Sequence, residues 1–277
     1  MMVSFSYPLY IMGCMKTKGM LFFDIDGTIL NTKHEITERT INALVNAYKK
    51  GYRIALASGR CYDGLSDITS KLPIPISKIT DNGAYNISEE DTMVSQSTFE
   101  QEIVPEIKKI VMSHKARIMY FTGRKWGLEN RDELYEEEVR IVRTEGMVEN
   151  LDSVAKRMSI NKLLAFADPE ESLTICNRLR EAFPSLNITL SSPTFTEINT
   201  SDADKGKGIR DLAKHYGVDI RDTIAFGDWD NDIPSFKTAG RAVAMANSSQ
   251  ALLEHATDRT LSNDEDGVAV FIENNLL

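Results

Sequence analysis

The sequence predicts an α/β fold in which a parallel-sheet core is interrupted by an inserted α+β module. Three apolar runs of strand length, Met20–Phe23, Tyr52–Ala57 and Thr223–Phe226, each end in a cluster of polar residues. Short continuous apolar runs are typical of strands buried on both faces of a parallel sheet. Between the second and third runs, strand-rich stretches alternate with helices, which favours a separate module. The core is therefore expected to be Rossmann-like.

The composition is that of a globular protein: 277 residues, 42% of them hydrophobic and 26% charged. The formal net charge of −9 argues against nucleic acid, whose phosphate backbone requires a basic surface. The odd number and wide spacing of Cys14, Cys61 and Cys176 favour reduced thiols in a cytoplasmic protein. Ile11–Cys14 loosely resembles a lipoprotein cleavage site but lacks a preceding basic residue, so residues 1–19 are expected to form a disordered extension. No run is long enough to cross a bilayer.

A strand, a helix and a second strand begin the core. After the strand Met20–Phe23, the segment Thr37–Lys50 carries apolar residues at helical spacing, with a threonine cap and a terminating Gly51. The second strand is Tyr52–Ala57. This order predicts a right-handed βαβ unit with parallel strands. A helix over Leu65–Leu72 and a short strand over Ile76–Thr80 are expected to follow.

The pattern changes from about Ala84, and we expect residues 84–192 to form the inserted module, with the core made of residues 1–83 and 193–277. The elements predicted beyond Ala84 are an edge strand over Thr92–Ser97, a helix around Val104–Val111, a hairpin of Arg117–Thr122 and Lys125–Glu129, a helix over Arg131–Arg143, a strand over Ile160–Ala167, a helix over Glu170–Phe183, and strands over Asn187–Leu190 and Phe195–Ile198.

The core pattern resumes near Asp204. A helix is predicted over Lys205–Tyr216, ended by Gly217, and the strand Thr223–Phe226 runs into Gly-Asp-Trp-Asp-Asn-Asp. The remaining elements are expected to be a helix over Ile233–Thr238, a strand over Ala242–Met245, and helices over Gln250–His255 and Val268–Asn274.

Two carboxylates, Asp24 and Asp26, follow the first strand. In an extended chain, residues two apart point to the same side, so both should project into one volume at the carboxyl end of the strand. Ligands of open α/β sheets bind outside those ends. Two like charges so close require a cation between them or a proton on one of them. The alternative is structural, because Asp-Gly is also a turn signal.

Further polar groups follow other predicted strands or open the following helices. They are Ser58 and Arg60 after the second strand, Lys205 at a helix start, and Asp228, Asn231 and Asp232 after Phe226. Each has a structural alternative: a serine or aspartate can cap a helix, and a lysine can be a solvated surface residue. Their joint occurrence in this order favours a functional site.

These residues resemble the four motifs of the haloacid dehalogenase superfamily: Asp-Ile-Asp-Gly-Thr, Ser-Gly-Arg, Lys-Gly, and Gly-Asp-x-x-Asn-Asp. The resemblance covers nearly the whole chain from Met20. The long insertion is similar to the C2B type of cap, as in Cof-type sugar-phosphate phosphatases, and Asn82-Gly83-Ala84 and Glu197-Ile198 also resemble that subfamily. A Mg²⁺-dependent phosphatase of small phosphorylated metabolites is implied, working through an aspartyl-phosphate.

The implied roles follow the chemistry of the side chains. Asp24 would be the nucleophile and Asp26 the general acid and base. Mg²⁺, which prefers oxygen ligands, would be held by Asp24, Asp228, Asp232 and the backbone carbonyl of Asp26. The residues expected to bind the phosphoryl group are Gly27, Thr28, Ser58, Gly59, Asn82, Asn231 and the catalytic Lys205, and Arg60 is expected either to pair with a carboxylate or to contact substrate.

The insertion is expected to close over this site as a lid, with Arg124, Trp126 and Lys162 as candidates for contacting the leaving group; the alternative for them is an exposed sheet face. Two other functions stay open. One is a phosphomutase using the same aspartyl-phosphate, and the other is a non-catalytic phosphate-binding or signalling relative. The expected partner is a small phosphate monoester, with no nucleic acid or membrane, and the chain is expected to be a monomer or weak homo-oligomer.

Overall fold

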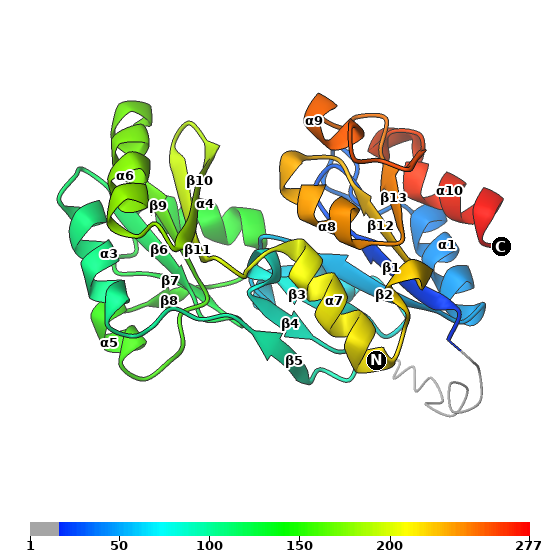
Figure 1. Ribbon diagram of the computed structural model, residues 1–277, viewed down its shortest axis with the longest axis horizontal. Helices are drawn as coiled ribbons and strands as arrows, with labels where there is room; N and C mark the ends of the chain where they lie inside the picture. The colour runs from blue at the N-terminus through cyan, green and yellow to red at the C-terminus, as the bar shows by residue number, and fades with distance from the viewer. Residues whose placement is uncertain (1–16) are drawn as a thin grey trace, which may run out of the picture.

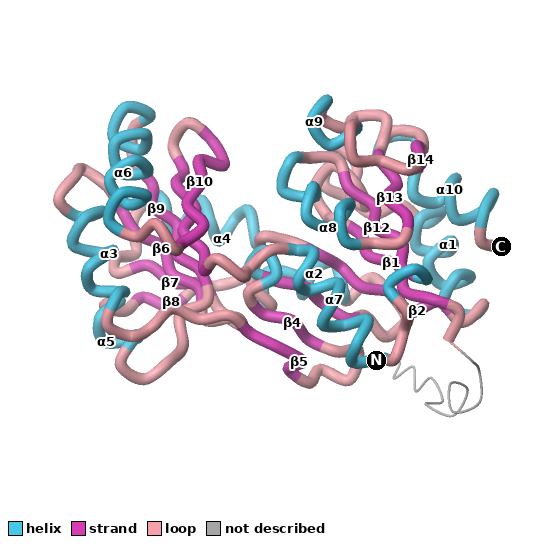
Figure 2. The backbone as a smooth tube through the Cα atoms, in the orientation of Figure 1, coloured by secondary structure: helices cyan, strands magenta, loops and turns pink. Residues whose placement is uncertain are grey.

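The computed structural model describes residues 17–277 and arranges them as two sheets with their covering helices (Figures 1 and 2). The larger sheet has eight strands in the order β14-β13-β12-β1-β2-β3-β4-β5. The elements of this core are β1 (Gly19–Phe23), α1 (Glu38–Lys49), β2 (Tyr52–Ala57), α2 (Ser66–Thr69), β3 (Ser77–Thr80), β4 (Tyr85–Ile87), β5 (Met93–Gln96), α7 (Lys205–Tyr216), β12 (Thr223–Gly227), α8 (Ile233–Thr238), β13 (Arg241–Ala244), α9 (Gln250–Leu253), β14 (Asp258–Arg259) and α10 (Gly267–Asn275).

The predicted α/β class and the parallel β1-α1-β2 unit are confirmed, but the sheet is mixed. Strands β14 to β3 are parallel, whereas β4 and β5 extend the sheet in antiparallel pairing. The helix predicted over Leu65–Leu72 is shorter, because only a 3₁₀ turn at Asp63–Leu65 and the brief α2 form there. The predicted extension over residues 1–19 lies mostly outside the described residues, as does Cys14, but Gly19 already belongs to β1.

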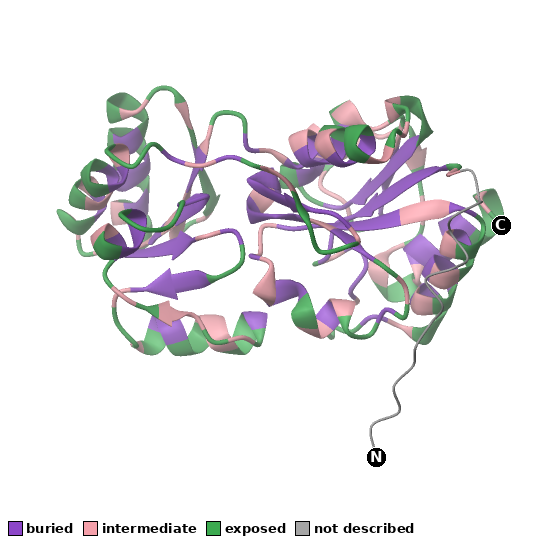
Figure 3. Ribbon diagram, turned by 90° about the horizontal axis from the view of Figure 1, so that it is seen from below, coloured by how far each residue is buried: buried purple, intermediate pink, exposed green. Residues whose placement is uncertain are grey.

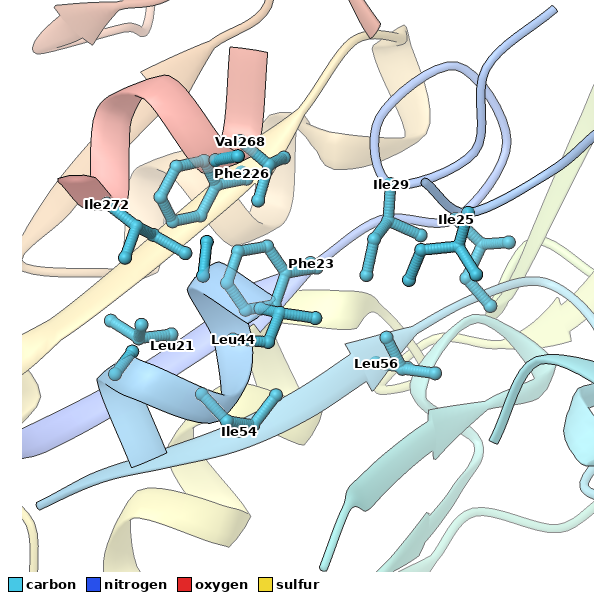
Figure 4. Close-up of a cluster of buried hydrophobic side chains, with 14 of the residues drawn as sticks. Leu21, Phe23, Ile25, Ile29, Leu44, Ile54, Leu56, Phe226, Val268 and Ile272 are labelled. Carbon is cyan, nitrogen blue, oxygen red and sulfur yellow. The ribbon is translucent and has the colours of Figure 1, made fainter. Parts of the chain in front are cut away.

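The alternation of β1 explains why helices cover both faces of the core sheet. Leu21 and Phe23 point into a cluster shared with α1 and α10, which Figure 4 shows around Phe226 and Ile272. Met20 and Phe22 point into the opposite cluster, formed with α7, α8 and α9. All of β1 is buried, as expected for a central parallel strand. The strand end is thereby held rigidly between two packed layers.

The smaller sheet belongs to the inserted module and has six strands in the order β10-β11-β9-β6-β7-β8. One face packs on α3, α5 and α6 and the other on α4, and Figure 3 shows the buried residues concentrated on its strands. The elements are α3 (Ile103–Met112), β6 (Arg117–Phe121), β7 (Trp126–Leu128), α4 (Glu133–Val142), β8 (Met147–Val148), α5 (Leu151–Ala155), β9 (Lys162–Phe166), α6 (Pro169–Ala182), β10 (Leu186–Ser192) and β11 (Phe195–Thr200).

Sheet membership differs at both ends from the module bounds expected at residues 84 and 192. Strands β4 and β5 pair onto the core sheet, and β11 pairs with β9 in the smaller sheet. The two segments that connect the core to the inserted module lie side by side, and the Ser97 hydroxyl of one donates to Asp202 of the other at 2.7 Å. We therefore propose that the inserted module begins near Ser97 and ends near Thr200. Within residues 17–277, no helix has the length and apolar character required to cross a membrane.

Candidate active site

The candidate site lies where the carboxyl ends of β1 and β12 adjoin. These strands are parallel neighbours with Phe23 opposite Phe226, and the Asp24 amide donates to the Phe226 carbonyl at 3.0 Å. Asp24 leaves β1 at this point, and Asp228 leaves β12 beside it. Their proximity is thus a direct consequence of strand order, as is usual for ligand sites in open α/β sheets.

Three carboxylates gather here: Asp24, Asp228 and Asp232 are buried, and one oxygen from each lies within 4.8 Å of the others. Burial and the nearby carboxylate of Asp232 raise the pKa of Asp24 well above its ordinary value. Burial also raises the pKa of Asp228 to about 6. Such a concentration of negative charge away from water calls for a compensating cation.

Lys205 supplies part of that compensation from the first turn of α7. Its Nζ donates to Asp24 Oδ1 at 2.5 Å and to Asp232 Oδ1 at 2.7 Å, and the side chain is 1% exposed. Burial alone would lower the pKa of the Lys205 ammonium, but Asp232 and Asp24 outweigh it and raise that pKa. The helix start is fixed by the Asp204 side chain, which accepts from the Lys207 amide at 2.6 Å. One ammonium thus bridges two of the three carboxylates.

Two further oxygens of the cluster accept hydrogen bonds from the protein. Asp232 Oδ2 accepts from the amides of Asp228 and Trp229 at 3.1 and 3.3 Å, and Asp228 Oδ1 accepts from the Thr28 hydroxyl at 2.8 Å. Both Asp232 oxygens are therefore engaged within the protein. The Thr28 hydroxyl, expected to face phosphate, is directed to Asp228 instead.

The cluster fits a hard divalent cation. Its free donor atoms are carboxylate oxygens, the ligands that Mg²⁺ prefers, and the single bridging ammonium leaves the three carboxylates with a net negative charge. Gly27 adds a steric argument: with φ of +83°, it lies so close to Asp228 that a Cβ atom would fall 2.2 Å from Oδ2. Glycine at this position therefore keeps open the space in front of the Asp228 carboxylate.

Besides burial, the charge of Asp26 contributes to the raised pKa of Asp228, so Asp26 lies near the cluster, although its side chain is more exposed than that of Asp24. Strand β1 ends at Phe23, so the alternation of an extended chain no longer applies two residues later. The Asp26 side chain is 48% exposed, and the Arg60 guanidinium donates to it at 2.8, 3.0 and 3.3 Å. His34 lies 3.7 Å away. Of the two roles left open for Arg60, pairing with a carboxylate is the one observed.

The Ser58–Gly59 segment follows β2 on the other side of β1. Ser58 is buried, its amide donates to the Ile79 carbonyl, and its hydroxyl oxygen accepts from the Arg60 amide at 3.2 Å. Asn82 lies against Gly59, where a Cβ would approach the Asn82 amide oxygen to 3.1 Å. The Asn82 side chain donates to Glu197 of the inserted module at 2.7 Å rather than into the cluster.

Two asparagines near the cluster contrast with each other. Asn231, expected to bind phosphate, is exposed and forms no side-chain hydrogen bond within residues 17–277. Asn247, which sequence reasoning missed, donates to the Gly27 carbonyl at 2.8 Å. It follows β13, the parallel neighbour of β12. Its place just beyond a strand end is the signal that could have revealed it.

The three candidates for contacting a leaving group lie in different environments. Trp126 is fully buried against Tyr135 and does not lie on an exposed sheet face. Arg124 is exposed, lies over the Tyr62 ring and pairs with Asp91. Lys162 is buried and reaches the core.

A cavity of about 320 Å³ lies between the core and α4. Arg60 and His34, which both approach Asp26, form part of its wall. The full lining mixes apolar and charged side chains: Leu30, His34, Arg60, Asp67, Ile68, Glu137, Arg140, Ile141, Val142 and Arg143. This size and mixed lining suit a small polar metabolite.

Comparison with known proteins agrees with this geometry. The family model described as haloacid dehalogenase-like hydrolase matches residues 21–272. Phosphatase YwpJ of Bacillus subtilis is 27% identical over 90% of this chain and 97% of its own. The 5-amino-6-(5-phospho-D-ribitylamino)uracil phosphatase YwtE of the same species is 27% identical over 90% and 95%. The solved structure of the subclass IIB sugar phosphatase BT4131 superposes with a TM-score of 0.78 at 25% identity, covering 92% of this chain and 98% of the other.

Proposed function

The chain belongs to the haloacid dehalogenase-like hydrolases and is a phosphatase, and we propose that it hydrolyses small phosphate monoesters through an aspartyl-phosphate on Asp24. The observation that carries the proposal is the buried cluster of Asp24, Asp228 and Asp232 with Lys205 bridging two of its members. It combines a nucleophile, a place for Mg²⁺ and a fixed ammonium in one volume.

In the proposed reaction, Asp24 attacks phosphorus, and the bond from phosphorus to the leaving oxygen breaks as the bond to Asp24 forms. A bound Mg²⁺ would reduce the repulsion between this carboxylate and the phosphate dianion. Asp26 donates a proton to the leaving oxygen and then accepts one from the water that hydrolyses the aspartyl-phosphate. Both carboxylates thereby return to their starting states, and inorganic phosphate is released.

The residues around the cluster support this division of labour. Lys205 holds one oxygen of Asp24, and in the transition state its ammonium would also stabilise the charge spread over the phosphoryl oxygens. Ser58 is a buried hydroxyl donor in the segment that follows β2. Arg60 and His34, which both approach Asp26, line the 320 Å³ cavity, and we propose that the alcohol protonated by Asp26 leaves toward that space.

The proposed substrates are sugar phosphates and related phosphorylated polyols. The named substrate of YwtE carries a phosphorylated ribityl chain, and BT4131 is named a sugar phosphatase. A phosphate-release screen over a metabolite panel, ranked by kcat/KM, tests this assignment. Release without any bisphosphate activator separates hydrolysis from phosphomutase action, and failure to release phosphate from any ester contradicts the proposal.

Replacing Asp26 by Asn is expected to lower kcat by about 10²–10⁴-fold, because both half-reactions lose their proton carrier. The loss should be smaller for p-nitrophenyl phosphate, whose leaving group needs no protonation, than for an alkyl phosphate. Steady-state rates on the two esters measure the difference. Normal turnover of the alkyl ester by Asp26→Asn would show that the proton is carried by another group.

Chelation by EDTA is expected to abolish phosphate release, and added Mg²⁺ to restore it. The pKa of about 6 for Asp228 in the metal-free protein means that its proton competes with the metal below that pH. At a metal concentration one hundredfold above Kd, Mg²⁺ should add about 2.7 kcal/mol to the unfolding free energy at pH 7.5 and much less at pH 5. Thermal melts at both pH values check this, and hydrolysis in EDTA or equal stabilisation at both would contradict it.

A further inference from the structure

Lys162 is a buried cation through which the inserted module touches the core. It opens β9, is 3% exposed, and its Nζ lies over the Phe121 ring and donates to the Gly59 carbonyl at 3.3 Å. Burying an ammonium is unfavourable unless it is paired and hydrogen-bonded. The reaction as proposed above does not use this residue, so its burial calls for another explanation.

The neighbouring strand β11 makes a second contact with the core. Glu197 lies 3.4 Å from the Lys162 ammonium and accepts from the Asn82 side chain at 2.7 Å. Asn82 in turn lies against Gly59. Two paired strands of the inserted module therefore each direct one charged side chain at the loops that follow β2 and β3.

The Gly59 carbonyl matters because of the peptide to which it belongs. In a planar trans peptide the C=O and N–H groups point in opposite directions. On one side of the Gly59–Arg60 peptide Lys162 binds the oxygen, and on the other the N–H donates to Ser58 Oγ at 3.2 Å. This bond occupies an acceptor site of the Ser58 oxygen and leaves its O–H free to donate elsewhere.

We propose that Lys162 is a positioning residue for the Ser58–Gly59 segment, which we expect to bind phosphate. Lys162 holds the Gly59 carbonyl and thereby fixes the plane of the Gly59–Arg60 peptide. This orients the Ser58 hydroxyl toward a phosphoryl oxygen. It also fixes the backbone position from which the Arg60 side chain reaches Asp26. One residue of the inserted module thereby controls a phosphate donor and the proton carrier together. The inference rests on the proposed function for the roles of Ser58 and Asp26.

The test compares Lys162→Met with Lys108→Met. Lys108 is also a largely buried lysine of the inserted module, paired with Glu129 at 2.6 Å and Asp152 at 2.7 Å, but it forms no hydrogen bond to the core loops. Lys162→Met should lower kcat by about 10–100-fold with KM changed much less, because a misplaced donor mainly affects the transition state. Lys108→Met should leave both constants within about twofold. Lys162→Gln, which keeps an N–H donor, should recover part of kcat.

A second readout does not depend on turnover. Amide hydrogen exchange at Arg60 should be about tenfold faster or more in Lys162→Met and unchanged in Lys108→Met, because the peptide plane is no longer held. Because Lys162 acts in part through Ser58, the kcat loss in the double variant Ser58→Ala/Lys162→Met should be smaller than the product of the two single losses.

Unchanged Arg60 exchange would overturn the inference, as would multiplied losses in the double variant or equal kcat losses in Lys162→Met and Lys108→Met. A wild-type chain that releases no phosphate from any ester would instead contradict the proposed function, and Arg60 exchange would still decide whether Lys162 holds the loop.

Discussion

Replacing Asp24 by Asn is expected to reduce kcat by about 10⁴-fold or more, on the scale seen when enzymes lose a covalent nucleophile. An amide cannot form the acyl phosphate, whereas the shape of the side chain and its bond from Lys205 can be retained. Acid-quenched reactions with a ³²P-labelled ester should leave label on the wild-type peptide that contains Asp24 and none on the variant. More than about 1% of wild-type turnover in Asp24→Asn would contradict the assignment.

The same change is expected to preserve or increase stability. Burial raises the pKa of Asp24, so its ionised form in the metal-free protein is destabilising at pH 7.5. Removing that charge should raise the free energy of unfolding by about 1 kcal/mol, as is common when a strained functional group is replaced. Asp230→Asn is a suitable control, because Asp230 lies in the same loop as Asp228 but is exposed and accepts from Ser249. Denaturant unfolding without metal compares the three proteins.

The sequence was sufficient to predict the elements that carry the cluster. The apolar run ending at Phe23 and the one ending at Phe226 are both buried strands, and the helix opened by Lys205 begins where capping by Asp204 requires. That β1 and β12 are neighbours depends on the long-range strand order, which local patterns do not specify. The order of the motifs indicated a shared site, and the sheet register explains why Asp24 and Asp228 meet there.

Side-chain directions were less predictable. The alternation argument did not anticipate that β1 ends at Phe23 and that the Asp26 side chain is half exposed and pairs with Arg60. Trp126 was expected either to contact the leaving group or to lie on an exposed sheet face, yet α4 covers that face and buries Trp126 against Tyr135. In both cases tertiary packing determines the direction and burial of the side chain. Neither the two-residue alternation of a strand nor the presence of one aromatic residue predicts that packing.

Replacing Lys205 by Met is expected to damage both activity and folding, because it removes the only cation that contacts the carboxylate cluster within residues 17–277. Breaking a buried ion pair from one side typically lowers the free energy of unfolding by about 3–5 kcal/mol. The loss of phosphoryl-oxygen stabilisation should reduce kcat by about 10³-fold. Lys214→Met is the matched control, since Lys214 lies exposed in the last turn of the same helix and should change stability by less than about 1 kcal/mol.

The pH dependence distinguishes this explanation from a simple packing defect. A carboxyl group whose pKa is raised in the folded state adds stability below its ordinary pKa, and this contribution is lost as the pH rises through the folded value, about 6 for Asp228. Without the ammonium, the pKa of Asp24 should rise further, which extends the window to higher pH. The stability difference between wild type and Lys205→Met should therefore be small at pH 5 and large at pH 8. Saturating Mg²⁺ should recover part of it, because a bound cation replaces the missing charge. A deficit that is independent of both pH and Mg²⁺ would mean that Lys205 acts through packing, and the carboxylate cluster would then need no cation to fold.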